Sequence, residues 1–191
     1  MRGLITTRTA PAIFVLLWST GFTGIRYGIP YAPPFTFIAI RMAFASVLLA
    51  LISLAITKRF THDLPTIGKS ALVGMTIHGA YLGGCFYGVK QGMPAGITAL
   101  ICSLQPVLVS VFSSIFFQEK LSPRKWLGLG LGLVGLVLVI APKLEGSGEQ
   151  GLPTAGVIAV FIALLGGTSG TLLQKKFGSG VEVLSGTSWQ Y

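Results

Sequence analysis

The chain has 191 residues, of which 52% are hydrophobic and only 10% are charged, and its mean hydropathy is +0.77. Soluble domains carry charge on about a quarter of their residues, so this chain lacks the polar surface that a water-soluble protein needs. The net charge of +9 could indicate nucleic-acid binding, but the basic residues lie in short clusters between apolar stretches. The composition therefore predicts an integral membrane protein and argues against a nucleic-acid partner.

Six apolar stretches predict membrane-spanning helices, because most are near the ~20 residues that cross a hydrocarbon core. Proline, glycine and charged residues separate them. The predicted spans are residues 11–28, 34–57, 67–89, 95–117, 126–140 and 154–174. A further apolar stretch, residues 181–191, is too short to cross a bilayer, which indicates a fragment or a truncated product.

The distribution of basic residues predicts a cytoplasmic N-terminus, because positive charge collects on the cytoplasmic side. With this orientation, the cytoplasmic segments hold Arg2, Arg8, Lys58, Arg59, Lys69, Lys120, Arg124, Lys125, Lys175 and Lys176, and the outer segments hold Arg26, Lys90 and Lys143. The basic N-terminus resembles that of a signal peptide, but no convincing cleavage site follows and further spans come after it. We therefore expect an uncleaved first helix in a multi-pass protein of the inner (plasma) membrane.

A weak internal repeat aligns the sixth span with the first. At a shift of 149 residues the aligned pairs are Gly21 with Gly170, Arg26 with Lys175, and Arg41 with Gln190. Five spans per repeat place the second copy upside down in the membrane, an arrangement typical of secondary transporters. The sequence thus predicts an all-α multi-helix bundle, with a first five-helix repeat at residues 1–142 and the beginning of an inverted second repeat at residues 153–191.

Polar residues recur on one side of several spans, and such stripes indicate faces turned toward protein or water. The candidates for lining a substrate cavity are Trp18, Ser19, Thr23 and Arg26 in the first span, Arg41 in the second, His78 and Tyr81 in the third, and Thr98, Cys102 and Gln105 in the fourth. The fifth span is mostly leucine, valine and glycine, so we expect it to pack at the edge. A polar cavity bounded by the first, third and fourth spans is predicted.

Each candidate also has a purely structural interpretation. Arg41 could attract an anionic substrate group, pair with a carboxylate elsewhere, or snorkel to the outer interface. His78 could relay protons, or hydrogen-bond a neighbouring helix as a neutral imidazole. Gln105 precedes Pro106, which frees a backbone carbonyl one turn earlier, and this could form a ligand contact or only a kink. The two aromatic candidates could stack on a ligand or only pack.

The sequence contains no motif that indicates an enzyme. It has no nucleophile with its base, no metal-binding helix and no phosphate-binding loop, so we expect no catalytic residue, metal or cofactor. Cys85 and Cys102 lie inside apolar spans and are expected to be free, packed thiols. Glycine pairs at four-residue spacing allow close helix contacts. These pairs are Gly24/Gly28, Gly84/Gly88, Gly128/Gly132 and Gly166/Gly170.

Residues 99–140 combine Pro106 in one predicted span, a turn at Glu119 (QEKLSPRKWLG) and a glycine-rich span after it. With these features they resemble the fourth and fifth helices of the EamA family of the drug/metabolite transporter superfamily. The stretch LLWSTGFTGIRYGIP, with Arg41 downstream, resembles its first and second helices. The resemblance covers one whole repeat and the opening of the next, and it marks Trp18, Arg41 and Pro106 as family-like positions.

This resemblance implies ten helices in two inverted repeats around a central cavity. It also implies export or exchange of small metabolites, amino acids or drugs by alternating access, without ATP hydrolysis and with the lipid bilayer and a small-molecule substrate as partners. A chain without most of the second repeat cannot enclose such a cavity unless two copies pair antiparallel as a homodimer. The alternative is a non-transporting membrane subunit or a defective half-transporter.

Overall fold

The computed structural model describes residues 2–28, 30–58, 60, 63–145 and 152–191. Over these residues the chain forms helices joined by short turns, with no β-strand. The prediction of an all-α membrane protein is confirmed. Three stretches are long and apolar enough to cross a membrane, namely Pro34–Ile56, Ala95–Phe116 and Thr154–Phe177. The six-span count stays a prediction.

Each predicted span corresponds to one helix or to a run of consecutive helices. The single helices are α1 (Arg2–Gly28), α2 (Pro34–Ile56), α7 (Pro123–Glu145) and α8 (Thr154–Phe177). The third span is a continuous rod made of α3 (Leu64–Gly74), the π-helix η1 (Met75–Leu82) and α4 (Gly83–Lys90). The fourth is divided into α5 (Ala95–Cys102) and α6 (Gln105–Phe116), and the last stretch forms α9 (Val183–Gln190).

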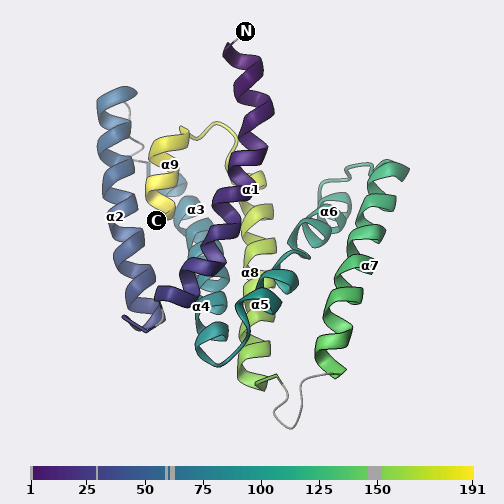
Figure 1. Ribbon diagram of the computed structural model, residues 1–191. Coiled ribbons are helices and arrows are strands. Elements are labelled where there is room, and N and C mark those ends of the chain that lie inside the picture. Colours follow the sequence, from purple (N-terminus) through teal and green to yellow (C-terminus); the bar gives the residue numbers. More distant parts are fainter. Residues whose placement is uncertain (1, 29, 59, 61–62, 146–151) are drawn as a thin grey trace.

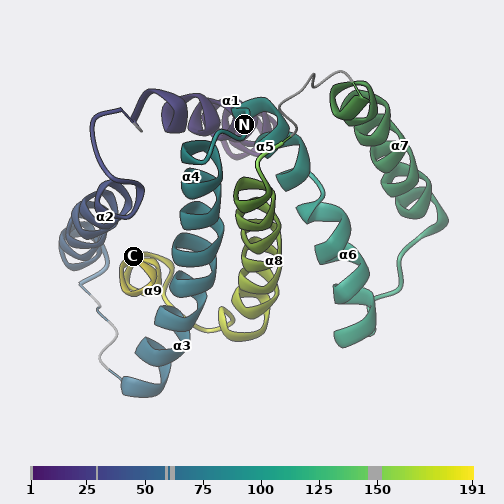
Figure 2. The same ribbon diagram turned by 90° about the horizontal axis from the view of Figure 1, so that it is seen from below.

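Successive spans run in opposite directions, and α8 lies at the centre of the bundle (Figure 1). It packs against η1 and α4 on one side and against α5 and α6 on the other. The short α9 lies between α2 and the α3 end of the rod (Figure 2). In the same view α7 lies at the periphery, where the sequence placed the fifth span.

Glycines allow α8 to approach the rod closely. A Cβ atom added at Gly84 would lie 2.5 Å from the carbonyl oxygen of Ala159, and one at Gly88 would lie 2.7 Å from a Val160 methyl group. On α8, a Cβ at Gly166 would meet the Ala80 methyl group at 2.6 Å. These distances are too short for any side chain, so the two backbones are in near contact.

Only some of the predicted glycine pairs form this contact. Gly84/Gly88 and Gly166/Gly170 lie in the interface between the rod and α8, whereas Gly24, Gly128 and Gly132 have no atom within 4 Å of an added Cβ. Spacing identifies glycines that could permit close approach, but which ones do so depends on which helix lies opposite.

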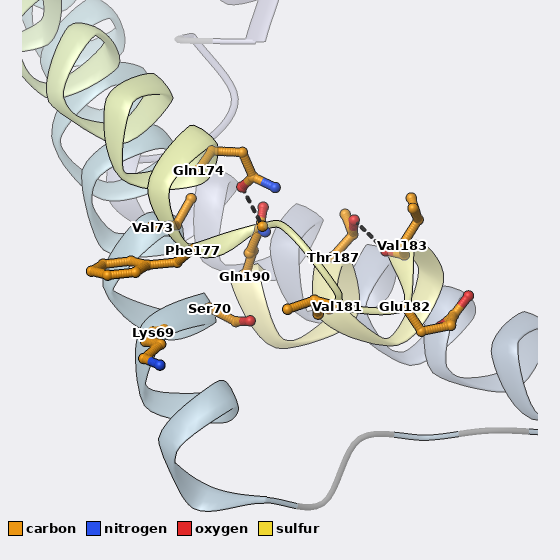
Figure 3. Close-up of a pocket in the computed structure, with 12 residues that line it drawn as sticks. Lys69, Ser70, Val73, Gln174, Phe177, Val181, Glu182, Val183, Thr187 and Gln190 are labelled. Carbon is orange, nitrogen blue, oxygen red and sulfur yellow. Dashed lines mark hydrogen bonds between the residues drawn. The ribbon is translucent and has the colours of Figure 1, made fainter. Parts of the chain in front are cut away.

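The α9 helix is fixed to α2 by its N-terminal cap. The Glu182 carboxylate accepts hydrogen bonds from the backbone N–H groups of Leu184 and Ser185, and from the Ser53 hydroxyl on α2. Hydrogen bonds to the ionised form lower the pKa of Glu182 below its ordinary value of 4.5, with the Ser185 N–H as the largest cause. Figure 3 shows Glu182 at the rim of a pocket between α3, α8 and α9.

This cap predicts a pH-dependent stability. Because the pKa of Glu182 is lowered on folding, its stabilisation is present above pH 4.5 and is lost as the pH falls through the lower folded value. We expect Glu182→Ala to lower the melting temperature at pH 7, and the gap to wild type to narrow below pH 4.5. Thermal unfolding of the detergent-solubilised full-length protein between pH 7 and pH 3 measures this. A gap that stays constant over that range would contradict the assignment.

Candidate functional site

Arg41 lines a cavity of about 120 Å³ between α1, α2 and the rod. On α2, Ile38 and Met42 are buried beside it, so Arg41 lies at the edge of the face that packs against the bundle. The remaining lining residues are Leu17, Gly21, Ile25, Tyr81, Leu82, Cys85 and Phe86. Arg41 makes no hydrogen bond or ion pair with any residue that the structure describes. The result is an unpaired cation against a mostly apolar wall.

Two thiols lie behind this wall. Cys85 on α4 is fully buried, Cys102 at the end of α5 is nearly so, and their sulfur atoms are 3.6 Å apart. Both are free, which agrees with the prediction of packed thiols. Tyr81 is 4% exposed, so only one edge of this residue reaches the cavity.

The thiol pair provides a direct test of this geometry. Copper(II)–phenanthroline should oxidise Cys85 and Cys102 to a disulfide, because the sulfur atoms need to approach by only about 1.6 Å to reach the ~2.05 Å bond length. The two thiols lose two protons, and two electrons pass to copper(II). Alkylation of the unfolded protein followed by mass spectrometry should show that both thiols are protected until a reductant is added. The Cys102→Ser variant is the control, and thiols that stay fully alkylatable in wild type would contradict the contact.

The fourth span is interrupted next to Pro106. Helix α5 ends at Cys102 and α6 begins at Gln105, because Pro106 has no N–H to donate to the Cys102 carbonyl. The Gln105 amide uses this break to reach α8. Its Nε2 donates hydrogen bonds to the Gly167 carbonyl and the Thr171 hydroxyl, both at 3.1 Å.

Thr98, another polar candidate of the fourth span, is also directed into the protein. Thr98 is fully buried, and among the described residues its hydroxyl has no hydrogen-bond partner. The sequence predicted that Thr98, Cys102 and Gln105 line the cavity with the first and third spans. In the structure α8 packs against this side of the fourth span, so the cavity beside Arg41 lies between the first, second and third spans instead.

His78 lies in the π-helical part of the rod and is half-buried. Its ring centroid is 4.3 Å from that of Tyr191, and its Nδ1 has no hydrogen-bond partner in the described part of the chain. A structural role for His78 would require a hydrogen bond to a neighbouring helix. Its Nδ1 does not make that bond with any described residue. His78 faces α9 and does not line the cavity beside Arg41.

The first-span candidates divide into two groups. The side chains of Trp18 and Ser19 lie outside what the structure describes. Thr23 and Arg26 are exposed, and Arg26 lines a separate hollow with the turn between α4 and α5. Of the predicted residues whose side chains the structure describes, Arg41 and Tyr81 line the cavity. Sequence reasoning missed its apolar wall, because leucine, isoleucine and phenylalanine carry no signal that separates a cavity from a core.

Charged residues at the α8 end form a second polar cluster. The Lys175 ammonium makes an ion pair with Glu119, donates a hydrogen bond to the Ser113 hydroxyl, and lies 5.0 Å from the centroid of the Phe117 ring. Lys176 and Lys69 both lie over the Phe177 ring. Lys69 and Lys176, which the sequence predicted to share one side of the membrane, thus lie beside the same ring.

Comparison with known proteins identifies a transporter family rather than an enzyme family. The model of the EamA-like transporter family matches residues 10–141. An uncharacterized transporter of Bacillus subtilis, YvbV, is 32% identical over 95% of this chain and 58% of its own length. A probable amino-acid metabolite efflux pump of Salmonella typhimurium is 24% identical over 86% of this chain and 52% of its own length.

Protein PecM of Dickeya dadantii is 27% identical over 91% of this chain and 55% of its own length. The chain thus spans about half the length of the curated relatives that it matches. No solved structure shows a significant match to it. With most of its length matched by the family model and an apolar helical bundle as its fold, the chain belongs to the EamA-like transporter family, whose members reside in membranes.

Proposed function

We propose that the protein is a secondary transporter that exports or exchanges small metabolites, amino acids or drugs across the inner membrane. The observation that carries this proposal is the cavity beside Arg41, where an unpaired cation lies within an apolar helix. An intramembrane charge is costly unless it serves a substrate or ion pathway, so Arg41 is a site candidate by default. The relative named as an efflux pump supports export as the direction.

We propose further that residues 1–142 form one repeat and residues 153–191 begin an inverted second repeat. The helix directions support this, because α8 runs opposite to its proposed counterpart α1, and α9 runs opposite to α2 (Figure 1). In such transporters the substrate site lies between the repeats, and rocking of one repeat against the other exposes it to alternate sides. The basic end of the bundle would face the cytoplasm by the positive-inside rule, as would the N-terminus.

Transport by the full-length protein in proteoliposomes tests the proposal. The vesicles are loaded with a labelled solute from a panel of amino acids, organic acids and amphipathic cations, and release is followed with and without a pH gradient. We expect saturable release or exchange of at least one class without ATP. Empty vesicles and vesicles with an unrelated membrane protein are the controls. No flux for any class, together with a stable complex with another membrane protein, would favour the alternative of a non-transporting subunit.

A further inference from the structure

We infer that the cavity beside Arg41 takes small monocarboxylates, whose carboxylate meets the guanidinium while a short aliphatic group contacts the apolar wall. This inference rests on the proposed transport function for its physiological role, because it names the substrate class of that site. Binding itself can be measured without transport, so the two can fail separately.

The charge of the cavity favours an anionic ligand. The acidic side chains that the structure describes are engaged elsewhere: Glu119 pairs with Lys175, Asp63 caps α3 through the Thr66 N–H, and Glu182 caps α9. None of them reaches Arg41, which has no hydrogen-bond partner among the described residues either. Arg41 is exposed on one side and meets a mostly apolar wall on the other. Its guanidinium gains most from an anion that it can hold with two parallel hydrogen bonds, and a carboxylate has that geometry.

The size and lining of the cavity favour a ligand with a short aliphatic group. A cavity of about 150 Å³ accepts benzene, and this one measures about 120 Å³. Besides Arg41, its lining is mostly apolar, with Leu17, Gly21, Ile25, Leu82 and Phe86, and Tyr81 and Cys85 also line it. A space of this size holds a short branched aliphatic chain against the apolar wall.

The cavity should also distinguish a monocarboxylate from an amino acid and from an amine. The lining residues include no carboxylate that could balance an ammonium group, and Arg41 repels any cation. A zwitterionic amino acid would therefore leave its ammonium unpaired beside an apolar wall. The cavity should prefer a monocarboxylate to the amino acid of the same skeleton, and should reject the corresponding amine.

Four ligands with related skeletons test this. They are 4-methylpentanoate, its neutral amide, leucine and 3-methylbutylamine, titrated into the purified full-length protein by isothermal calorimetry. We expect saturable binding of 4-methylpentanoate, weaker binding of leucine, and no binding of the amide or the amine. Arg41→Gln should weaken binding of the acid by roughly 10- to 100-fold, the loss expected for hydrogen bonds to a charged group. The affinity of Arg41→Lys for the acid should lie between those of wild type and Arg41→Gln. Lys90→Gln, at the exposed end of α4, should bind the acid as tightly as wild type does.

The results separate the two proposals. If the acid binds but no solute crosses the bilayer, the carrier function fails and the anion site stands. If solutes are transported but the amide or the amine binds as well as the acid, the inference is wrong and the carrier function stands. Absence of acid binding also overturns the inference. The ligand series decides even if Arg41→Gln fails to fold, because the amide removes the charge from the ligand instead of from the protein.

Discussion

Combining Gly84→Ala with Gly166→Ala is expected to destabilise the bundle severely, whereas Gly79→Ala in the same rod should leave it intact. The first two Cβ atoms would lie 2.5 Å from the Ala159 carbonyl oxygen and 2.6 Å from the Ala80 methyl group. Neither neighbour can move away as a flexible side chain could, so α8 and the rod must separate. Overpacking costs about 1–3 kcal/mol per site, and here the central helix is displaced.

The control substitution Gly79→Ala is expected to leave the stability of the bundle unchanged or to raise it slightly. An added Cβ at Gly79 meets no atom within 4 Å, and alanine is up to about 1 kcal/mol more favourable than glycine inside a helix. Gly132→Ala in the peripheral α7 is a second control for the same reason. Thermal unfolding and size-exclusion profiles of the solubilised full-length proteins should show a lowered melting temperature or aggregation only for the double variant. Equal melting temperatures for all four proteins would show that α8 does not pack on the rod as described.

The fold was largely predictable from the sequence, because a segment that crosses lipid must be apolar, about 20 residues long and internally hydrogen-bonded. Apolar length, interrupted by proline, glycine and charge, located the helices. The ends predicted for the second and sixth spans lie within a few residues of those of α2 and α8, whereas α1 begins nine residues before the predicted start of the first span. Pro106 also indicated where the fourth span would be interrupted, since its missing N–H acts locally. The π-helix between Met75 and Leu82 was not predicted, because no local signal in the sequence marks it; in the structure this segment packs against α8.

The site was predictable only in part, for a related reason. The periodicity of Thr98, Cys102 and Gln105 placed them on one face of the fourth span, but periodicity does not say what lies opposite that face. In the structure α8 lies there, and Gln105 hydrogen-bonds it. Arg41 could be recognised because charge in an apolar span is rare at any position. The apolar surroundings of Arg41 could not be recognised from the sequence, since they depend on the packing of three separate helices.

A disulfide between α2 and α9 is expected to stop transport, and this prediction tests alternating access directly. Ser46 and Ser188 face each other: each hydroxyl donates a hydrogen bond to the other's backbone carbonyl, at 2.8 and 2.9 Å, and the two hydroxyl oxygens are 3.5 Å apart. Ser46→Cys with Ser188→Cys therefore places two thiols within reach of oxidation. Helix α2 belongs to the proposed first repeat and α9 to the second, so this bond would tie together the two bodies that must rock.

The experiment uses a Cys85→Ala, Cys102→Ala background, so that only the introduced thiols react. Oxidation should reduce transport by at least about tenfold, in line with loss of a required conformational step, and a reductant should restore it. Either single serine variant should be insensitive to the oxidant. Oxidation of the native thiols Cys85 and Cys102 in the wild-type protein is the matched comparison: a disulfide there would join α4 to α5 within one repeat, and rigid-body rocking leaves that distance unchanged. Full cross-linking of α2 to α9 with undiminished transport would mean that these helices move as one unit, and the boundary between moving bodies would then have to lie elsewhere.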